Sequence, residues 1–309
     1  GIKVYHLNIG QPDIETPSAI MDAVRNASIP VLEYSHSAGN ESYRKKLVEY
    51  YAKAGISLSH EEIMITAGGS EAIQFGFFSC LNPGDEVIVP EPFYANYNGF
   101  ACAAGVKVVP ITSNIENGFA LPPIAAFEKV LTPRSKAILI CNPNNPTGYL
   151  YSDQEMEALG QLCHKHDLYL FSDEAYREFC YAGNAMSALS LKGMEKQVVV
   201  MDTISKRYSA CGARIGAFIT RNKDVYSTAM KFAQARLSPP GLAQIMGEAA
   251  VDLPDNFFDA PKAEYQARRD LLVKRLNQIP GVFCPNPGGA FYAIARLPID
   301  DSDRFCQWL

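Results

Sequence analysis

The fold and chemistry of this chain are indicated most clearly by the stretch Thr203-Ile204-Ser205-Lys206-Arg207-Tyr208-Ser209, which is followed by Gly212-Ala213-Arg214-Ile215-Gly216. The lysine comes soon after the apolar run Val198-Val199-Val200-Met201, so it emerges from a predicted buried strand. An amine in such a place can attack a carbonyl, and the nearby hydroxyls and the arginine suit a phosphate. The same segment, taken alone, also fits a strand that ends in a solvated Lys-Arg pair.

Two further motifs favour the first interpretation. Asn142-Pro143-Asn144-Asn145-Pro146-Thr147-Gly148 follows the apolar segment 136–141, and Phe171-Ser172-Asp173-Glu174-Ala175-Tyr176 ends the apolar segment that begins at Leu168. All of these motifs lie just beyond the carboxyl ends of predicted strands, where open α/β sheets place their ligands. A lysine that forms a Schiff base, together with a phosphate clamp, is what pyridoxal 5'-phosphate requires. We therefore expect a site for this cofactor.

Strand-like and helix-like segments alternate from about residue 61 onward. We predict strands at 62–66, 85–90, 106–111, 136–141, 168–172, 197–202 and 215–220, with helices between most of them. This alternation indicates a mainly parallel, doubly wound α/β sheet. The last of these strands follows Lys206 too closely for a helical crossover, so we expect it to be antiparallel. From about residue 256 the pattern changes to a long charged helix, followed by a predicted strand at 290–295.

Composition limits the classes of function. The chain has 309 residues, of which 48% are hydrophobic and 20% charged, as is ordinary for a globular protein. It has 28 basic and 33 acidic residues, a net charge of −5 and no basic block, so we expect no nucleic-acid partner. No apolar run approaches the roughly 20 residues that span a membrane, so we expect no membrane partner and no secretory leader.

The cysteines and histidines point neither to disulfides nor to a metal. Eight cysteines are scattered without Cys-x-x-Cys spacing, and several fall in apolar segments, which suits free thiols in a reducing compartment. We therefore expect a cytoplasmic protein. His164 and His166 would diverge on a helix, and no third ligand is in view, so no metal site is expected.

The chain resembles the fold-type I pyridoxal phosphate enzymes, specifically the class I/II aminotransferases related to aspartate aminotransferase. The matching segments run in the family's order from Asn8-Ile9-Gly10-Gln11-Pro12-Asp13 to Gly288-Gly289-Ala290-Phe291-Tyr292, so the resemblance covers almost the whole chain. It implies a seven-stranded large domain at 31–255 and a smaller α+β domain. The smaller domain would be formed by an N-terminal segment at 1–30 and the start of a C-terminal part at 256–309. Family members extend further at both ends, so we expect this smaller domain to be incomplete.

The resemblance assigns roles around the cofactor ring. Lys206 would form the Schiff base and move the proton between the substrate's α-carbon and the cofactor. Asp173 would keep the ring nitrogen protonated, so that the ring accepts electrons. Asn145 and Tyr176 would hydrogen-bond the phenolic oxygen, and Tyr94 would stack on the ring face. An ordinary polar strand end and core aromatics are the plain alternatives for these positions.

The phosphate is expected at the start of a helix. The segment Ala67-Gly68-Gly69-Ser70-Glu71 joins a predicted strand to a helix. Glycines there let the backbone approach closely, and the first amides of the helix point toward an anion. A tight left-handed turn without a ligand would have the same sequence. By resemblance, the phosphate ligands are Gly69, Ser70, Thr203, Ser205 and Arg214.

The resemblance also implies a homodimer. Tyr34 resembles the tyrosine that this family extends to the partner subunit's phosphate, which would make the active sites shared. A surface or core tyrosine is the plain alternative. Gly10 and Asn145 resemble residues that bind the substrate. The family also anchors the substrate carboxylate with an arginine near the carboxyl end, but Arg296 and Arg304 fall too early to match it.

The resemblance thus implies a pyridoxal phosphate-dependent transaminase of the aspartate type. It would move an amino group between an amino acid and a 2-oxo acid by a ping-pong Schiff-base mechanism. A carbon–sulfur β-lyase would share every cofactor residue, and a non-catalytic pyridoxal phosphate-binding effector domain would share the fold. A Rossmann dehydrogenase is disfavoured, because its Gly-x-Gly-x-x-Gly fingerprint is missing from the glycine turn and it would not need Lys206.

Overall fold

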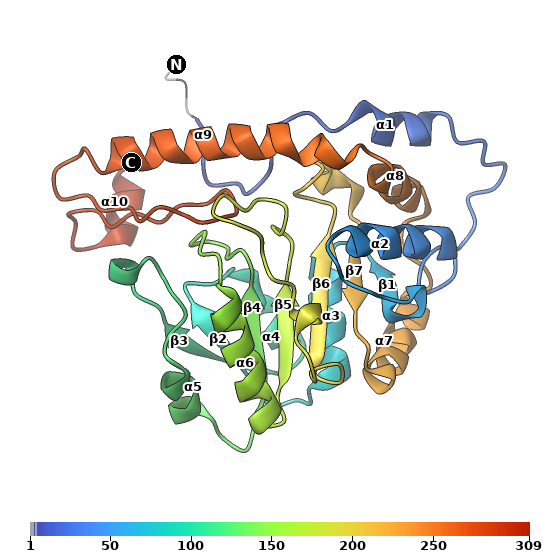
Figure 1. Ribbon diagram of the computed structural model, residues 1–309, viewed down its shortest axis with the longest axis horizontal. Helices are drawn as coiled ribbons and strands as arrows, with labels where there is room; N and C mark the ends of the chain where they lie inside the picture. Colours follow the sequence, from blue (N-terminus) through green and yellow to red (C-terminus); the bar gives the residue numbers. More distant parts are fainter. Residues whose placement is uncertain (1–2, 4) are drawn as a thin grey trace.

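Figure 1 shows the computed structural model of the chain, which describes residue 3 and residues 5–309. Its centre is a seven-stranded sheet in the order β1-β7-β6-β5-β4-β2-β3. The strands are β1 (Ile63–Thr66), β2 (Glu86–Glu91), β3 (Lys107–Thr112), β4 (Ser135–Cys141), β5 (Tyr169–Asp173), β6 (Val198–Thr203) and β7 (Gly216–Ile219). Strands β2 to β6 pair in parallel, and β7 is antiparallel to β1 and β6. The predicted strands of the sheet and the reversed direction of β7 are confirmed.

The α-helices of the described chain are α1 (Ser18–Arg25), α2 (Glu41–Lys53), α3 (Gly69–Cys80), α4 (Asn96–Ala103), α5 (Ile124–Val130), α6 (Asp153–Lys165), α7 (Lys223–Arg236), α8 (Gly241–Val251), α9 (Asp259–Leu276) and α10 (Ser302–Trp308). Short 3-10 helices are η1 (His60–Glu62), η2 (Ile115–Asn117), η3 (Ala188–Ser190), η4 (Cys211–Ala213) and η5 (Asp255–Phe258). Across residue 3 and residues 5–309, no helix combines the length and apolar character needed to cross a lipid bilayer.

Two hydrophobic cores lie on opposite faces of the sheet. Along β6, Val198 and Val200 belong to one core, and Val199 and Met201 belong to the other. Helices α2, α6 and α8 contribute to the first core, and helices α3, α4 and α7 contribute to the second. The strands other than the edge strand β3 are buried on both faces, so they read in the sequence as largely apolar runs. This is the doubly wound arrangement expected from the alternation.

The register of the sheet brings several loops to one edge. Cys141 of β4 pairs with Asp173 of β5, which in turn pairs with Met201 of β6. The loops that leave these parallel strands therefore start at the same level. Gly216, the first residue of β7, pairs with both Thr66 and Thr203, so the loop after β1 also lies beside the loop after β6.

Helix α9 runs along one side of the molecule, at the top of Figure 1. The N-terminal segment docks against it, because Asp13 accepts a hydrogen bond from Arg268 at 2.7 Å and lies beside the Tyr265 hydroxyl. Farther along the N-terminal segment, α1 packs on α8. The N-terminal segment therefore contacts both α9 and the helices on the sheet.

The predicted strand at 290–295 is wrong. Residues 290–295 form no strand, and the isolated bridges on either side of them join Gly289 to Cys180 and Arg296 to Phe283. Phe291 instead stacks on Tyr265 of α9, with ring centroids 5.2 Å apart, and Tyr292 packs edge-to-face on Tyr176. The aromatic side chains that favour a strand are here satisfied by packing against α9 and the sheet loops rather than by a ladder.

Candidate active site

A cavity of about 510 Å³ lies at the edge of the sheet where β4, β5 and β6 end. Its lining includes the predicted residues Gly10, Gly69, Ser70, Tyr94, Asn145, Asp173, Tyr176, Thr203, Ser205, Lys206 and Arg214. These residues come from loops that are far apart in the sequence, and the strand register brings them together. Tyr34 does not line this cavity and is 75% exposed on the surface.

Lys206 lies in the turn after β6 and points its amine into this space. Its Nζ donates a hydrogen bond to the Gly10 carbonyl oxygen at 2.5 Å and lies 3.8 Å from the sulfur of Cys211. Within residue 3 and residues 5–309, no carboxylate forms an ion pair with it. The half-buried amine is thus held by a backbone carbonyl, a partner that it can leave for a ligand.

Asp173 is buried at the end of β5. Burial raises the pKa of this carboxyl group, while hydrogen bonds from the Tyr97 hydroxyl (2.8 Å) and the Ala175 N–H (3.1 Å) act in the opposite direction. A cation that enters the cavity next to Asp173 would favour its ionised form. The sequence interpretation missed Tyr97, although it lies close to Tyr94 in the sequence.

An anion cradle lies at the start of α3. Gly68 has a φ of 85°, and a Cβ atom placed on it would lie 2.4 Å from Nη2 of Arg214. Only glycine leaves room for the guanidinium to lie against this turn. The hydroxyls of Thr203 and Ser205, 2.7 Å apart, line the same cavity. The cradle therefore combines helix amides, hydroxyls and one guanidinium, which together form a donor set for a phosphate.

A tyrosine pair closes another side of the cavity. Tyr176 shares a 2.7 Å hydrogen bond with the Tyr292 hydroxyl, and Nδ2 of Asn145 lies 3.3 Å from the Tyr176 hydroxyl as a donor. Burial raises the pKa of Tyr292 to about 12 and that of Tyr176 well above its ordinary value, so both stay protonated at neutral pH. Tyr292 was quoted in the sequence for the resemblance but was given no role there.

A second acid–base set lies beside the cavity and also escaped the sequence interpretation. Asp202, at the end of β6, accepts two parallel hydrogen bonds from Arg207, at 2.8 and 2.9 Å. It also accepts one from the Tyr51 hydroxyl at 2.8 Å. Both charged side chains are almost fully buried. The two charges neutralise each other within the protein, although Nε of Arg207 has no hydrogen-bond partner among the described residues, so this pair does not present a free charge to a ligand.

Neither C-terminal arginine lines the cavity. Arg296 pairs with Glu116 on the surface and stacks on Phe283. Arg304 lies in the exposed helix α10. Among the described residues, Arg214 is the arginine that lines the cavity.

The cavity residues fit pyridoxal phosphate. The glycine turn leaves space that a Cβ would fill, and the donors around it match a phosphate. The hydrogen-bond partners of the buried Asp173 carboxylate among the described residues are neutral. Lys206 offers a primary amine on the same wall. When bound, this cofactor supplies an electron sink for the bond that breaks at the substrate's α-carbon. The fold and the cavity thus define a lysine-based pyridoxal phosphate enzyme.

Comparison with known proteins gives the family. The family model for aminotransferase class I and II matches residues 2–309. A protein of Bacillus subtilis (strain 168), provisionally named aminotransferase YugH, is 35% identical over 95% of this chain and 76% of its own length. An aspartate aminotransferase of Geobacillus stearothermophilus is 31% identical over 94% of this chain and 75% of its own length. The solved structure of an alanine aminotransferase from Pyrococcus furiosus superimposes with a TM-score of 0.90 at 33% identity, covering 97% of this chain and 78% of that one.

The chain belongs to the class I and II aminotransferases. It is a pyridoxal phosphate-dependent transaminase, as the sequence motifs implied. The expectations of cofactor and reaction class are therefore confirmed, while the role of each cavity residue stays a prediction.

Proposed function

We propose that this transaminase takes aspartate as its amino donor and passes the amino group to a 2-oxo acid. The proposal is supported by the motifs quoted above, which look most like the aspartate branch. It is also supported by the Geobacillus relative, which is named an aspartate aminotransferase. Alanine is the second candidate donor, because the similar Pyrococcus structure is named an alanine aminotransferase.

The observation that carries the assignment of roles is that Lys206, Asp173 and Arg214 line one cavity. In the proposed mechanism, Lys206 leaves the Gly10 carbonyl and takes up, then returns, the proton at the substrate's α-carbon. Asp173, held by Tyr97, would hold the cofactor at its ring nitrogen and favour the protonated form of that nitrogen.

The remaining residues would hold and orient the cofactor and the substrate. Tyr94 would cover the ring face, while Asn145 and Tyr176 would donate hydrogen bonds to the phenolic oxygen. Gly10 and Asn145 would contact the substrate carboxylate. The phosphate would lie in the cradle formed by Gly69, Ser70, Thr203, Ser205 and Arg214.

We infer that the enzyme is a homodimer with shared active sites. Tyr34 lies in an exposed apolar segment together with Val31 and Leu32, which are 70% and 64% exposed. This segment runs beside Leu237, whose carbonyl accepts a 2.7 Å hydrogen bond from Ser37. Leu237 and Leu242 are themselves 50% and 40% exposed, so the patch continues across both segments. A second copy of the chain would bury this patch and bring Tyr34 to the neighbouring cavity.

Hybrid dimers test the shared site. A mixture of Lys206→Ala chains with Tyr34→Ala chains contains hybrids in which one site carries both substitutions and the other carries neither. We expect such hybrids to regain about half of the wild-type activity per dimer, well above either parent. Hybrids no more active than the Tyr34→Ala parent would show that Tyr34 does not act across the interface.

The division of the chain into 31–255 and a smaller unit built from 1–30 and 256–309 stays a proposal. A cytoplasmic location is proposed on the ground that Cys141 and Cys163 are free thiols in the core.

The donor is tested by comparing kcat/KM for aspartate, alanine and arginine, each with 2-oxoglutarate as acceptor. We expect aspartate to exceed alanine by at least about tenfold, a difference of about 1.4 kcal/mol in transition-state binding. The Lys206→Ala variant serves as the blank. A kcat/KM for alanine tenfold above that for aspartate would show that alanine, and not aspartate, is the preferred donor.

A further inference from the structure

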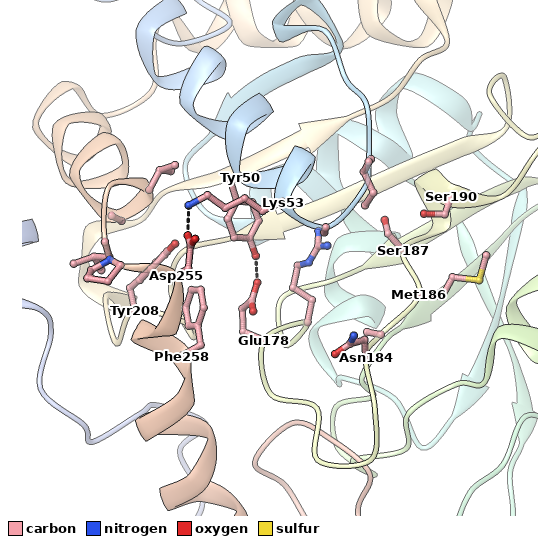
Figure 2. Close-up of a pocket in the computed structure, with 18 residues that line it drawn as sticks. Tyr50, Lys53, Glu178, Asn184, Met186, Ser187, Ser190, Tyr208, Asp255 and Phe258 are labelled. Atoms are coloured by element: carbon pink, nitrogen blue, oxygen red, sulfur yellow. Dashed lines mark hydrogen bonds and ion pairs between the residues drawn. The ribbon is translucent and has the colours of Figure 1, made fainter.

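A second cavity, of about 530 Å³, lies apart from the active-site cavity and shares no lining residue with it. It is bounded by the C-terminal ends of α2 and α8, by η5 and by the loop after β5. Figure 2 shows its labelled side chains, with Tyr50 and Lys53 of α2 on one side and Asn184, Met186 and Ser187 of the loop on the other. Its volume lies in the range of small-molecule sites.

The wall of this cavity holds a buried arginine that the protein does not fully satisfy. The side chain of Arg177 is only 7% exposed. Within the described part of the chain, its Nη1 atom has no hydrogen-bond partner and lies 3.5 Å from Oε2 of Glu174. The guanidinium stacks over the Tyr51 ring, 4.7 Å from its centroid, which fixes its plane. Nη1 itself is enclosed and faces Glu174, but the hydrogen bonds of the described residues include none donated by the Arg177 side chain, which lines the cavity. The rest of the guanidinium is therefore free to bind an acceptor such as a carboxylate.

The charges of the lining residues balance, while Glu174, which does not line the cavity, lies against Arg177. Lys53 and Asp255 form a 2.6 Å ion pair across the rim, which Figure 2 marks with a dashed line. The remaining lining charges are Arg177 and Glu178, and Glu178 accepts a hydrogen bond from the Tyr50 hydroxyl. A dianion would meet two carboxylates here, whereas a molecule with one positive and one negative group would meet an opposite charge for each.

The rest of the lining is apolar. Ile56, Val251 and Leu253 line the cavity together with Met186 and Phe258. Such a surface accommodates an aliphatic or aromatic side chain, with methionine as an adaptable wall.

We propose that this cavity is a second ligand site, which binds an apolar α-amino acid with its carboxylate on Arg177 and its ammonium on Glu178. The site lies next to the active site along the chain, since Arg177 follows Tyr176 and the lining residue Tyr208 lies in the same turn as Lys206. It goes beyond transamination, because its ligand need not react.

Cycloleucine is a suitable probe, since it is an apolar zwitterion without an α-hydrogen and cannot be transaminated. Its binding to the cofactor-loaded protein would be measured by isothermal titration calorimetry. Cyclopentanecarboxylate and cyclopentylamine, which each lack one of the two charges, serve as matched ligands. We expect both to bind at least about tenfold more weakly than cycloleucine. Equal binding of cyclopentanecarboxylate would overturn the assignment of a zwitterion.

Three variants locate the binding. Arg177→Met removes the carboxylate partner, and Ser190→Trp fills the cavity from an exposed position while keeping Arg177. We expect each to raise the dissociation constant of cycloleucine at least about tenfold. Asn145→Ala, in the active-site cavity, should leave it unchanged. Binding that survives Ser190→Trp but is lost in Asn145→Ala would overturn the proposal, as would the absence of any binding to the wild type at about 10 mM cycloleucine.

Discussion

Two acid–base sets lie at the ends of the neighbouring strands β5 and β6, and they differ in what satisfies them. Asp202 and Arg207 form two parallel hydrogen bonds at 2.8 and 2.9 Å and are almost fully buried. Asp173 and Lys206 instead use neutral partners, the Tyr97 hydroxyl and the Gly10 carbonyl. The charges of the first set neutralise each other within the protein, whereas the second set leaves its charges open to a ligand.

The difference shows why a charged motif cannot be interpreted from residue type alone. Lys206 and Arg207 are adjacent in the sequence, yet one lines the cavity and the other is locked to Asp202. Buried pairs are strongly destabilised when one partner is removed, because the other charge is left uncompensated. Open charges are stabilised only when a ligand arrives. Substitutions in the two sets should therefore separate activity from stability.

The largest expected effect is on turnover in Lys206→Ala. Loss of the amine should lower kcat by at least about 10³-fold, because proton transfer at the α-carbon has no other base. The melting temperature of the variant should change little, since Lys206 forms no ion pair in the described structure. Steady-state kinetics and calorimetry on the same preparation check this. If the variant kept a tenth of the wild-type turnover, Lys206 would not be the base that moves the proton at the α-carbon.

Arg207→Met should give the opposite result, with stability lost first. The free energy of unfolding is expected to fall by about 3–5 kcal/mol, because Asp202 stays buried without its partner. Urea denaturation measures this change. Lys165→Met is the matched control, since its pair with Glu128 is exposed and should contribute no more than about 1 kcal/mol. An equally small change in Arg207→Met would contradict the comparison.

Asp173→Asn should separate activity from stability in a pH-dependent way. We expect turnover to fall by at least about 100-fold, because a neutral amide cannot hold a charged ring nitrogen. Burial raises the pKa of Asp173, so the unfolded chain releases this proton at lower pH than the folded one. The wild-type group therefore destabilises the fold increasingly as pH rises through its unfolded pKa.

The cofactor-free Asp173→Asn protein should consequently be more stable than the cofactor-free wild type at neutral pH. This advantage should disappear below about pH 4, where the carboxyl is protonated in both states. Thermal unfolding as a function of pH measures it. A variant that is less stable at neutral pH would show that Asp173 already has a stabilising partner in the empty protein.

The smallest effect is expected for Tyr97→Phe. This change removes one hydrogen bond to Asp173 and keeps the ring, so it should cost about 1 kcal/mol, or about fivefold in kcat/KM. The activity of Tyr97→Phe should fall less than that of Asp173→Asn. If both fell equally, Tyr97 would itself be essential to the chemistry.

Much of the sheet could be predicted because its strands, apart from the edge strand β3, are buried on both faces. The seven strands read as apolar runs, and the motifs at their carboxyl ends identified most of the active-site cavity. The strand predicted at 290–295 is wrong, because Phe291 and Tyr292 favour a strand by residue type but pack on Tyr265 and Tyr176. Strand propensity reflects how well a side chain packs on a half-buried surface, and it does not by itself predict hydrogen bonding to a neighbouring strand.

Other features depend on contacts between distant segments. The link between Tyr51 and Asp202 joins α2 to β6, and no local pattern signals it. The second cavity is likewise assembled from four separate segments of the chain. Tyr97 lies close to Tyr94, and Tyr292 lies in a motif of the resemblance, but the role of each depends on which side chain it meets.

The hydrogen bond between Lys206 and the Gly10 carbonyl connects the reactive amine to the N-terminal segment. Any ligand that engages the amine competes with this anchor, so occupancy and the docking of that segment are thermodynamically linked, and the linkage is reciprocal. The docking of the N-terminal segment therefore depends on whether a ligand occupies the site. We expect amide hydrogen exchange around Asn8–Gln11 to differ between the empty and loaded protein, and identical exchange would show that the two are uncoupled.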